Sequence, residues 1–387
     1  MSNFDILILG GGYAGLMTAL RLGNRGLGAH VTLVNAVPDF VERVRHHQLG
    51  AGTAPPRRSI TRLLRGSGVR FVAGRVTRVD LDRRVARLVG GSELAFDRAV
   101  FALGSIGDAG AVPGVREHAS VIGDEAGALA LRAQLARGAR EVVVVGGGPT
   151  GIETAAELAE HGARVTLVAS PGVGGFLSPV GQWYLVRALA RLGVRIVDAP
   201  VREVRAGSVV LDGGELACDA CVWAGGFRAA PLAREAGLEV SVEGRIIVDA
   251  QLRSVSHPMV YAVGDAAEAR TEAGAAIGTG CKYAMPMGAH AAENLARALA
   301  GKAERPFRIG DVGLCLSLGR RDGLVQLAGR GARPGGVITG RTAAWIKERI
   351  LRFTVWALRM ERYFALAFWP KPKRLTSRPA QAKQLAA

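Results

Sequence analysis

Short apolar runs alternate with stretches of helical periodicity along the chain, and several of the runs end at glycine. Residues 4–9 form the first run, a helical pattern with Leu16, Ala19 and Leu20 follows, and a second apolar run covers residues 30–35. Apolar strands alternating with amphipathic helices are typical of a parallel sheet covered by helices. The beginning of the chain therefore predicts a strand–helix–strand unit with glycines at its first turn.

The glycines of that turn have the spacing Gly10-x-Gly12-x-x-Gly15. The first glycine permits a tight turn, the second lets the backbone approach a pyrophosphate, and the third lets the helix pack close to its strand. The N-terminal amides of the helix then face the phosphates. We predict a dinucleotide site here, with contacts from Gly10, Gly12, Tyr13, Ala14 and Gly15.

Asn35 ends the second apolar run, twenty residues beyond Gly15. An acidic residue at this position usually binds the ribose hydroxyls of the adenosine. The asparagine amide can still donate and accept a hydrogen bond, but it carries no charge. We predict that Asn35 makes this contact in an uncharged form.

The whole pattern returns at residues 141–168. An apolar run leads into Gly146-x-Gly148-Pro149-Thr150-Gly151, and the Val-Thr-Leu-Val of residues 31–34 recurs at 165–168. Two matching copies predict two dinucleotide sites. The predicted contacts of the second site are Gly146, Gly148, Pro149, Thr150 and Gly151. Ala169 stands where an acid would select NADH, so the sequence leaves both NADH and NADPH open.

Further short runs predict additional strands, and one long pattern at residues 283–300 predicts a helix. Three of the buried runs end at Gly104, Gly226 and Gly264, the last followed by Asp265. Because ligands bind at the carboxyl ends of parallel strands, these glycines and Asp265 are candidate contacts. The predicted strands cover residues 69–72, 76–80, 85–88, 94–96, 99–105, 194–197, 209–211, 217–227, 259–267, 314–318 and 324–327.

Residues 38–53 are dense in arginine and histidine and predict a loop. Two interpretations have similar weight. The loop is solvated surface, or it lies over the ligand at the ends of the strands. In the second case Arg43 is a candidate contact.

Composition limits the class of protein. The chain has 387 residues, 49% of them hydrophobic, and 53 glycines, which suits two or three globular domains. The four cysteines make no disulfide framework, and Cys218-x-x-Cys221 falls in a strand pattern whose geometry suits buried thiols better than a disulfide. No ligand spacing predicts a metal. With no leader pattern and no long apolar run, we expect a cytoplasmic protein.

The formal charge of +17 is concentrated near the C-terminus, where residues 341–387 hold eleven basic and two acidic residues. Such a segment favours an anionic partner, either a membrane or a nucleic acid. An apolar stripe at helical spacing favours an amphipathic helix over residues 341–369 that lies in a membrane interface, rather than one docked on protein. The stripe consists of Ile346, Ile350, Phe353, Ala357, Met360, Phe364 and Phe368, joined by Trp345, Trp356 and Trp369.

Taken together, the two Gly-Gly-Gly-x-x-Gly copies, the strand end at residues 101–105 and the segment 261–265 resemble flavoproteins with two dinucleotide-binding domains, the pyridine nucleotide-disulfide oxidoreductase superfamily. Within it, the chain is most similar to type II NADH dehydrogenases and apoptosis-inducing-factor-like quinone reductases. The resemblance covers about residues 4–330 and implies an α/β fold: two Rossmann-like domains, the second inserted in the first, then a C-terminal β/α cap with an amphipathic helix. The implied domains are residues 1–115 with 241–310, 116–240, and 311–387.

The resemblance also implies the cofactors and their contacts. FAD occupies the first glycine motif, with Asp265 at its ribityl–phosphate portion and Arg43 and Met285 as further contacts. NADH or NADPH occupies the second motif, with Glu153 near the nicotinamide as the catalytic residue. The implied reaction is hydride transfer from the nicotinamide to flavin N5 and then transfer of two electrons to a quinone.

Disulfide reductases of this superfamily carry their redox-active cysteine pair after the first glycine motif or just before the second. No such disulfide is expected here, because the first 217 residues contain no cysteine. The implied protein is peripheral on the inner face of the membrane, and a homodimer is left open. One alternative is a reductase of a small electron-transfer protein or pathway metabolite, and Cys281 and Cys315 leave a sulfide:quinone reductase open. A non-enzyme alternative is a basic redox sensor that binds nucleic acid, which the apolar stripe of the tail disfavours.

Overall fold

Two five-stranded parallel sheets form the centre of the computed structural model, which describes residues 4–23, 29–271, 274–310, 313–329 and 335–365. The first sheet has the order β21-β9-β1-β2-β5 and the second has the order β11-β18-β12-β13-β14. The strands of the first sheet are β1 (Phe4–Leu9), β2 (Ala29–Asn35), β5 (Arg70–Ala73), β9 (Arg98–Phe101) and β21 (Val260–Ala262). Those of the second are β11 (Ala119–Val121), β12 (Glu141–Val145), β13 (Arg164–Val168), β14 (Arg195–Val197) and β18 (Ala220–Trp223).

The two sheets repeat one plan, as the two glycine motifs predict. Helix α1 (Tyr13–Gly23) follows β1, and α6 (Pro149–Glu160) follows β12. Each sheet is accompanied by a three-stranded antiparallel sheet, which lies between β5 and β9 in the chain of the first unit and between β14 and β18 in that of the second. These smaller sheets are β6 (Val76–Asp80), β7 (Val85–Leu88) and β8 (Glu93–Ala95) in the first unit, and β15 (Val201–Arg205), β16 (Ser208–Leu211) and β17 (Gly214–Ala217) in the second.

The order of the edge strands shows how the units are connected. β21 pairs with β9 although the entire second sheet lies between them in the sequence. The chain therefore leaves the first unit after β9 and returns to complete it. β10 (Ser105–Gly107) and β19 (Phe227–Ala229) pair antiparallel where the chain crosses between the units. The predicted α/β class, with one Rossmann-like unit inserted in another, is confirmed, while the exact domain boundaries stay predictions.

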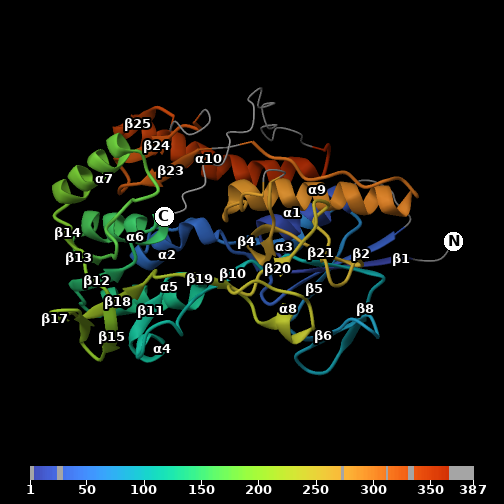
Figure 1. Cartoon of the computed structure of the whole chain (residues 1–387), viewed down its shortest axis with the longest axis horizontal. Coiled ribbons are helices and arrows are strands. Elements are labelled where there is room, and N and C mark those ends of the chain that lie inside the picture. The colour runs from blue at the N-terminus through green and yellow to red at the C-terminus, as the bar shows by residue number, and fades with distance from the viewer. Residues whose placement is uncertain (1–3, 24–28, 272–273, 311–312, 330–334, 366–387) are drawn as a thin grey trace, which may run out of the picture.

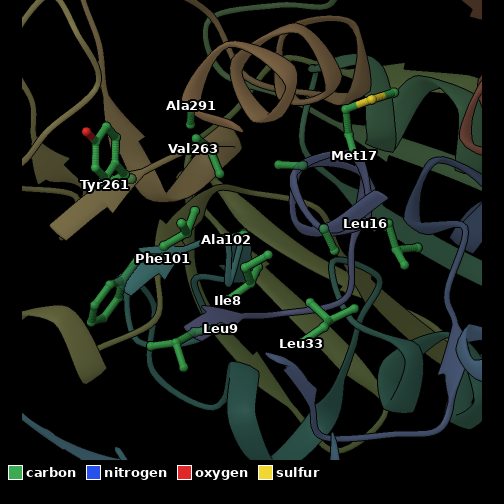
Figure 2. Close-up of a cluster of buried hydrophobic side chains, with 14 of the residues drawn as sticks. Ile8, Leu9, Leu16, Met17, Leu33, Phe101, Ala102, Tyr261, Val263 and Ala291 are labelled. Atoms are coloured by element: carbon green, nitrogen blue, oxygen red, sulfur yellow. The ribbon is translucent and has the colours of Figure 1, made fainter. Parts of the chain in front are cut away.

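The core of the first unit is built from the apolar runs. Ile8 and Leu9 of β1, Leu33 of β2 and Phe101 of β9 are each at most 1% exposed. Figure 2 shows them packed with Leu16 and Met17 of α1 and with Ala291 of α9 (Cys281–Leu299). Burying one such side chain contributes about 2 kcal/mol. Small residues bring the helices close, since Thr18 Oγ1 donates to the carbonyl of Gly288 at 3.0 Å.

The remaining elements fill the two units. The helices are α2 (His46–Ala51), α3 (Ile60–Leu64), α4 (Val115–His118), α5 (Glu125–Ala136), α7 (Pro179–Arg191) and α8 (Leu232–Glu235), with 3-10 turns at Arg43–Arg45 and Gly264–Ala266. The strands are β3 (Asp39–Phe40), β4 (Arg58–Ser59), β20 (Ile246–Ile247) and β22 (Ala267–Glu268).

The prediction of a simple loop at residues 38–53 is wrong. The segment contains β3, a 3-10 turn and α2, and the side chains of Arg45, His46 and His47 are almost fully buried. The interpretation as solvated surface is therefore also wrong. These polar side chains lie inside because α2 packs against both α5 and α6.

A C-terminal cap follows the first unit. It consists of an antiparallel sheet of β23 (Leu314–Ser317), β24 (Gly323–Gln326) and β25 (Val337–Thr339), and of the long helix α10 (Gly340–Glu361). The red helix α10 runs along the top of the molecule in Figure 1 and packs on α1 and on the cap sheet. None of the helices within the described ranges is long and apolar enough to span a bilayer.

Helix α10 has two different faces. One face is buried and includes Lys347, Leu351 and Glu361, whose carboxylate accepts a hydrogen bond from Arg21 Nη2 at 3.0 Å. The other exposes Trp345, Phe353 and Trp356. The predicted apolar stripe is divided between these faces: Ala357 is buried, whereas Ile350, Phe353 and Phe364 are exposed. Its last members, Phe368 and Trp369, lie outside the described residues.

Candidate active site

The first glycine motif has one glycine that its own fold does not require. Gly10 has φ +105°, and a Cβ added there would lie 2.5 Å from the carbonyl oxygen of Ala102. A Cβ on Gly15 would lie 1.8 Å from the carbonyl oxygen of Gly10. A Cβ on Gly12, in contrast, would have no atom within 4 Å. Internal packing therefore does not require a glycine at position 12. The bare backbone there, beside the N-terminus of α1, fits the approach of a ligand with a pyrophosphate.

The second motif reproduces this geometry. Gly146 has φ +127°, and Cβ atoms added at Gly146 and Gly151 would lie 2.5 and 1.9 Å from backbone oxygens. A Cβ on Gly148 would have no atom within 4 Å. Gly148 is the N-cap of α6, and Pro149 and Thr150 form its first turn. The structure thus contains two equivalent glycine turns, one in each unit, and phosphate binding there stays a prediction.

Asn35 contacts the first glycine loop directly. Its Oδ1 accepts a hydrogen bond from the amide of Gly11 at 2.9 Å, and its Nδ2 donates to the carbonyl of Val37 at 2.8 Å. The asparagine therefore fixes the shape of the loop, and its ribose contact stays a prediction. At the equivalent place in the second unit, the side chain of Ala169 has neither a charge nor a hydrogen-bonding atom.

Asp265 joins three elements at the carboxyl end of the first sheet. Its Oδ2 accepts from Ser105 Oγ at 3.0 Å, just after β9, and its Oδ1 accepts from the amide of Gly280 at 2.8 Å, just before α9. The preceding Gly264 packs against Ala14 of the first motif, since a Cβ there would lie 3.2 Å from that of Ala14. The predicted residues of the first site therefore lie around one strand end.

Arg43 lies beside the same strand end. Its Nη2 donates to the carbonyl of Gly123 at 2.8 Å, and its Nη1 is 3.0 Å from the position of a Cβ on Gly104. Burial lowers the pKa of Arg43, although the charge of Asp265 opposes that effect. Met285, predicted as a further contact, is buried in α9 among the apolar side chains of the core. Gly226 follows β18 as Gly104 follows β9.

Glu153 occupies the middle of a buried cluster built from distant parts of the chain. Its Oε1 accepts hydrogen bonds from Lys347 Nζ at 3.0 Å and from the amide of Ser317 at 2.9 Å. Its Oε2 lies 3.9 Å from Nδ1 of His47. The cluster therefore connects α6 of the second unit, α2 of the first unit, and β23 and α10 of the cap.

The charges in this cluster depend on one another. Burial acts to raise the pKa of Glu153, but the charge of Lys347 and the hydrogen bond from the Ser317 amide outweigh it and hold that pKa below its ordinary value. Burial acts to lower the pKa of Lys347, and Glu153 more than reverses this. Burial lowers the pKa of His47 to about 4, so its imidazole is neutral at pH 7. The result is one buried ion pair next to a neutral imidazole. Such perturbed groups are concentrated at functional sites.

One side-chain nitrogen on each of three consecutive buried residues has no hydrogen-bond partner in the described part of the chain. These atoms are His46 Nε2, His47 Nε2 and Gln48 Nε2, all in the first turn of α2. A buried polar atom without a partner costs about 1–3 kcal/mol, so a cluster of them requires an explanation. A bound group with hydrogen-bonding atoms beside α2 would satisfy them, as the flavin site implied by the sequence would require.

A cavity of about 630 Å³ opens beside the ion pair. Lys347 forms part of its wall, and the other walls come from the segment around α2, the turn between β23 and β24, and α10. The lining residues are Glu42, Arg45, Gln48, Thr53, Pro55, Arg58, Ser317, Gly319, Arg320, Ala344, Lys347, Glu348, Arg352 and Val355. The cavity therefore connects the exterior with the Glu153–Lys347 pair.

The resemblance proposes Glu153, whereas no motif in the sequence singles out Lys347 or His47. Lys347 is one of the basic residues of the C-terminal segment 341–387, and His47 belongs to the predicted loop of residues 38–53. The position of Lys347 next to apolar residues of a predicted helix is a signal that this lysine is buried. That signal does not identify Glu153 as the partner of Lys347. The pairing depends on the packing of α10, which local sequence does not specify.

The four cysteines are free thiols. Burial raises the pKa values of Cys218 and Cys221 to about 11 and 12, in agreement with the predicted structural role. Burial also raises the pKa of Cys281, at the first residue of α9, to about 11. Within the described part of the chain, His, Cys, Asp and Glu side chains form no group that could hold a metal.

A family model described as pyridine nucleotide-disulphide oxidoreductase matches residues 4–294. The chain belongs to this family. Membership confirms the resemblance predicted from the glycine motifs, makes the protein an oxidoreductase, and supports the predicted cofactors FAD and NADH or NADPH.

Curated members of the family are similar over most of their length. An NADH dehydrogenase-like protein of Mycobacterium tuberculosis is 32% identical over 75% of this chain and 79% of the relative. A demethylphylloquinone reductase of Synechocystis is 29% identical over 91% and 92%. A type II NADH:quinone oxidoreductase of Staphylococcus epidermidis is 28% identical over 89% and 93%.

The fold of the whole chain also has a solved counterpart. The sulfide:quinone oxidoreductase of Aquifex aeolicus superposes with a TM-score of 0.79 at 16% identity, covering 97% of this chain and all of that one. At this identity the likeness concerns the fold alone. It includes the cap, which lies beyond the residues that the family model matches.

Proposed function

We propose that this family member is a FAD-dependent NAD(P)H:quinone oxidoreductase. The observation that carries the proposal is the arrangement of two equivalent glycine turns, one in each unit, with the buried Glu153–Lys347 pair joining the second unit to the cap. Its relatives include a demethylphylloquinone reductase and a type II NADH:quinone oxidoreductase. In this proposal FAD binds at Gly12 and the nicotinamide nucleotide binds at Gly148.

Bound FAD would supply the hydride acceptor and the two-electron relay between NAD(P)H and the quinone. The chain's own residues would bind the two nucleotides, orient them and shield them from water. The bare backbones at Gly12 and Gly148 admit the pyrophosphates, and Asp265 orients the ribityl–phosphate portion. Glu153 would lie near the nicotinamide, and its buried ion pair with Lys347 would hold both side chains in a fixed position.

The cavity beside Lys347 is the proposed site of the quinone. It reaches the ion pair from the side of the cap, whereas the Gly148 cradle lies at the N-terminus of α6. The two substrates would therefore enter from different directions. In this proposal the electrons pass directly to the quinone without a thiol relay.

The exposed face of α10 is the proposed membrane contact. Trp345, Phe353 and Trp356 are 59%, 41% and 45% exposed, and the guanidinium of Arg349 lies 5.2 Å from the ring centre of Trp345. Aromatic and cationic side chains on one exposed helical face suit the interface of an anionic bilayer. We place the protein at the inner face of the membrane. A homodimer stays a prediction.

The proposed function is tested by the visible spectrum of the purified protein. We expect a bound oxidised flavin that is bleached by NADH or NADPH without oxygen and restored by a quinone. A colourless protein would contradict the proposal. A flavin bleached by nicotinamide nucleotide, but restored only by a small electron-transfer protein, would favour the reductase alternative.

A further inference from the structure

Two arginines in the cavity wall are held through only one of their nitrogens. Arg58 Nε donates to Glu42 at 3.3 Å, and Arg320 Nε donates to Glu157 at 3.0 Å. The terminal amino groups of these two side chains make no hydrogen bond to any described residue. Each guanidinium is therefore tethered in position, while its two terminal amino groups are available to a ligand.

Arg45 differs because its hydrogen bonds are used within the wall. Its Nη1 and Nη2 donate to the two oxygens of Glu348 at 3.0 and 3.1 Å, and its Nε donates to Glu42 at 3.1 Å. Arg45 therefore has no nitrogen left for a ligand. Arg58 and Arg320 contact their carboxylates through Nε, so their terminal amino groups stay available.

The balance of lining side chains supports this conclusion. Five of the fourteen are cationic and two are anionic, and none is aromatic. The apolar side chains are limited to Pro55, Ala344 and Val355. Walls of this kind offer little to an apolar tail, and they favour a ligand that carries a negative charge.

We propose that this cavity selects an acidic acceptor: a quinone bearing a carboxylate, sulfonate or phosphate group, bound by the terminal amino groups of Arg58 and Arg320. The inference rests on the proposed function and specifies its substrate class. A guanidinium binds such groups through two parallel hydrogen bonds, which are about twice as strong as neutral ones. Arg352 lies at the exposed rim, with its Nε on Glu348 at 2.8 Å, and adds to the attraction of anions.

The test compares two naphthoquinones that differ in charge. Steady-state rates are measured with NADH and either 1,4-naphthoquinone-2-sulfonate or neutral 2-methyl-1,4-naphthoquinone. Because the quinones also differ in reduction potential, the deciding quantity is the change in the ratio of their kcat/KM values between variants. We expect this ratio to fall about tenfold in Arg58→Gln and in Arg320→Gln, as for loss of one charge-assisted hydrogen-bonded contact.

Arg137→Gln is the matched control, because Arg137 is exposed at the end of α5 and does not line the cavity. It should keep the ratio of the unmodified protein, and Arg58→Lys should recover part of the loss. Flavin absorbance per protein shows that each variant is folded. Raising the salt concentration should also lower the ratio, since screening weakens the attraction.

Calorimetric binding of naphthalene-2-sulfonate provides a readout without turnover. Its affinity should fall about tenfold in the same two variants. Unchanged ratios and unchanged naphthalene-2-sulfonate affinity in both variants would overturn the anion site while leaving the proposed function intact. Failure to reduce either quinone, with arginine-dependent binding of naphthalene-2-sulfonate, would contradict the proposed function and leave the anion site standing.

Discussion

At the scale of single residues, the most unusual feature is the buried ion pair of Glu153 and Lys347. Both side chains are at most 10% exposed, so each charge loses nearly all of its hydration. Such pairs add little net stability, whereas removing one partner leaves the other charge uncompensated. Their retention in the interior therefore fits a role in the reaction better than a role in stability.

This distinction can be tested with Lys347→Met and Glu153→Gln. We expect Lys347→Met alone to lower the free energy of unfolding by about 3–5 kcal/mol, because Glu153 is left buried and unpaired. The double variant should recover most of that loss and still have low turnover. Urea unfolding and steady-state rates provide the two measurements. Normal turnover in the double variant would show that the pair is structural.

The buried imidazoles make stability depend on pH. Burial lowers the pKa values of His46 and His47 to about 4, whereas the unfolded chain has the ordinary value of 6.5. As the pH falls below 6.5, the unfolded chain binds protons that the folded protein does not, so stability is lost between pH 6.5 and 4. Glu153, whose pKa is below 4.5, loses its contribution only at lower pH.

Between pH 7 and pH 5 each of these imidazoles should remove about 2 kcal/mol from the free energy of unfolding. His46→Gln should reduce the total drop by that amount. Unfolding curves of the unmodified protein and the variant at both pH values provide the comparison. Equal drops in the two proteins would mean that His46 is not held neutral in the interior.

At the scale of elements, the strand–glycine–helix unit contains glycines with two different purposes. Gly10, Gly15 and their counterparts are required because a side chain would strike backbone atoms. Gly12 and Gly148 have open space beside them, so their lack of a side chain matters only to a ligand. Equivalent substitutions should therefore have different outcomes within one motif.

We expect Gly12→Val to fold without flavin and Gly148→Val to keep its flavin while the KM for NAD(P)H rises more than about tenfold. Gly15→Ala should unfold the first unit, because its Cβ would lie 1.8 Å from a carbonyl oxygen. Flavin absorbance, circular dichroism and nucleotide kinetics separate the three cases. Flavin retained in Gly12→Val would show that the first cradle is not the FAD site.

At the scale of the whole molecule, α10 joins all three parts of the chain. Lys347 reaches Glu153 of the second unit, Glu361 reaches Arg21 of the first, and the helix packs on the cap sheet. Deleting residues 341–387 would therefore remove Lys347 and expose the core. A membrane test by truncation would confuse loss of binding with loss of fold.

Substitutions on the exposed face avoid this problem. Trp345→Gln, Phe353→Gln and Trp356→Gln together should weaken binding to anionic vesicles by about tenfold or more, since each removes apolar area from the interface. Trp183→Gln, at an exposed tryptophan of α7, is the control. Vesicle sedimentation measures binding and turnover of a water-soluble quinone monitors folding. Unchanged sedimentation would contradict the membrane contact.

The sequence predicted the repeated strand–glycine–helix units well, because their signals are local: apolar runs, glycine spacing and helical period. Through resemblance it also proposes Asp265 and Glu153 as residues near the ligands, and these two roles stay predictions. It did not predict the burial of His46 and His47, the partner of Glu153, or the cavity. Each of these depends on α2 and α10 packing against parts of the chain that are far away in sequence, which no local pattern encodes.

The position of β21 has a consequence for how the protein is made. The strands of the second sheet all lie between Ala119 and Trp223, whereas the free side of β9 has no neighbour until Val260–Ala262 leaves the ribosome. Domains fold as units during synthesis, so the inserted unit can close before the one that surrounds it. In the meantime β9 presents an unpaired apolar edge, the kind of surface that invites aggregation and chaperone binding. The first unit therefore matures after the inserted one, although its first strand is the first to be synthesised.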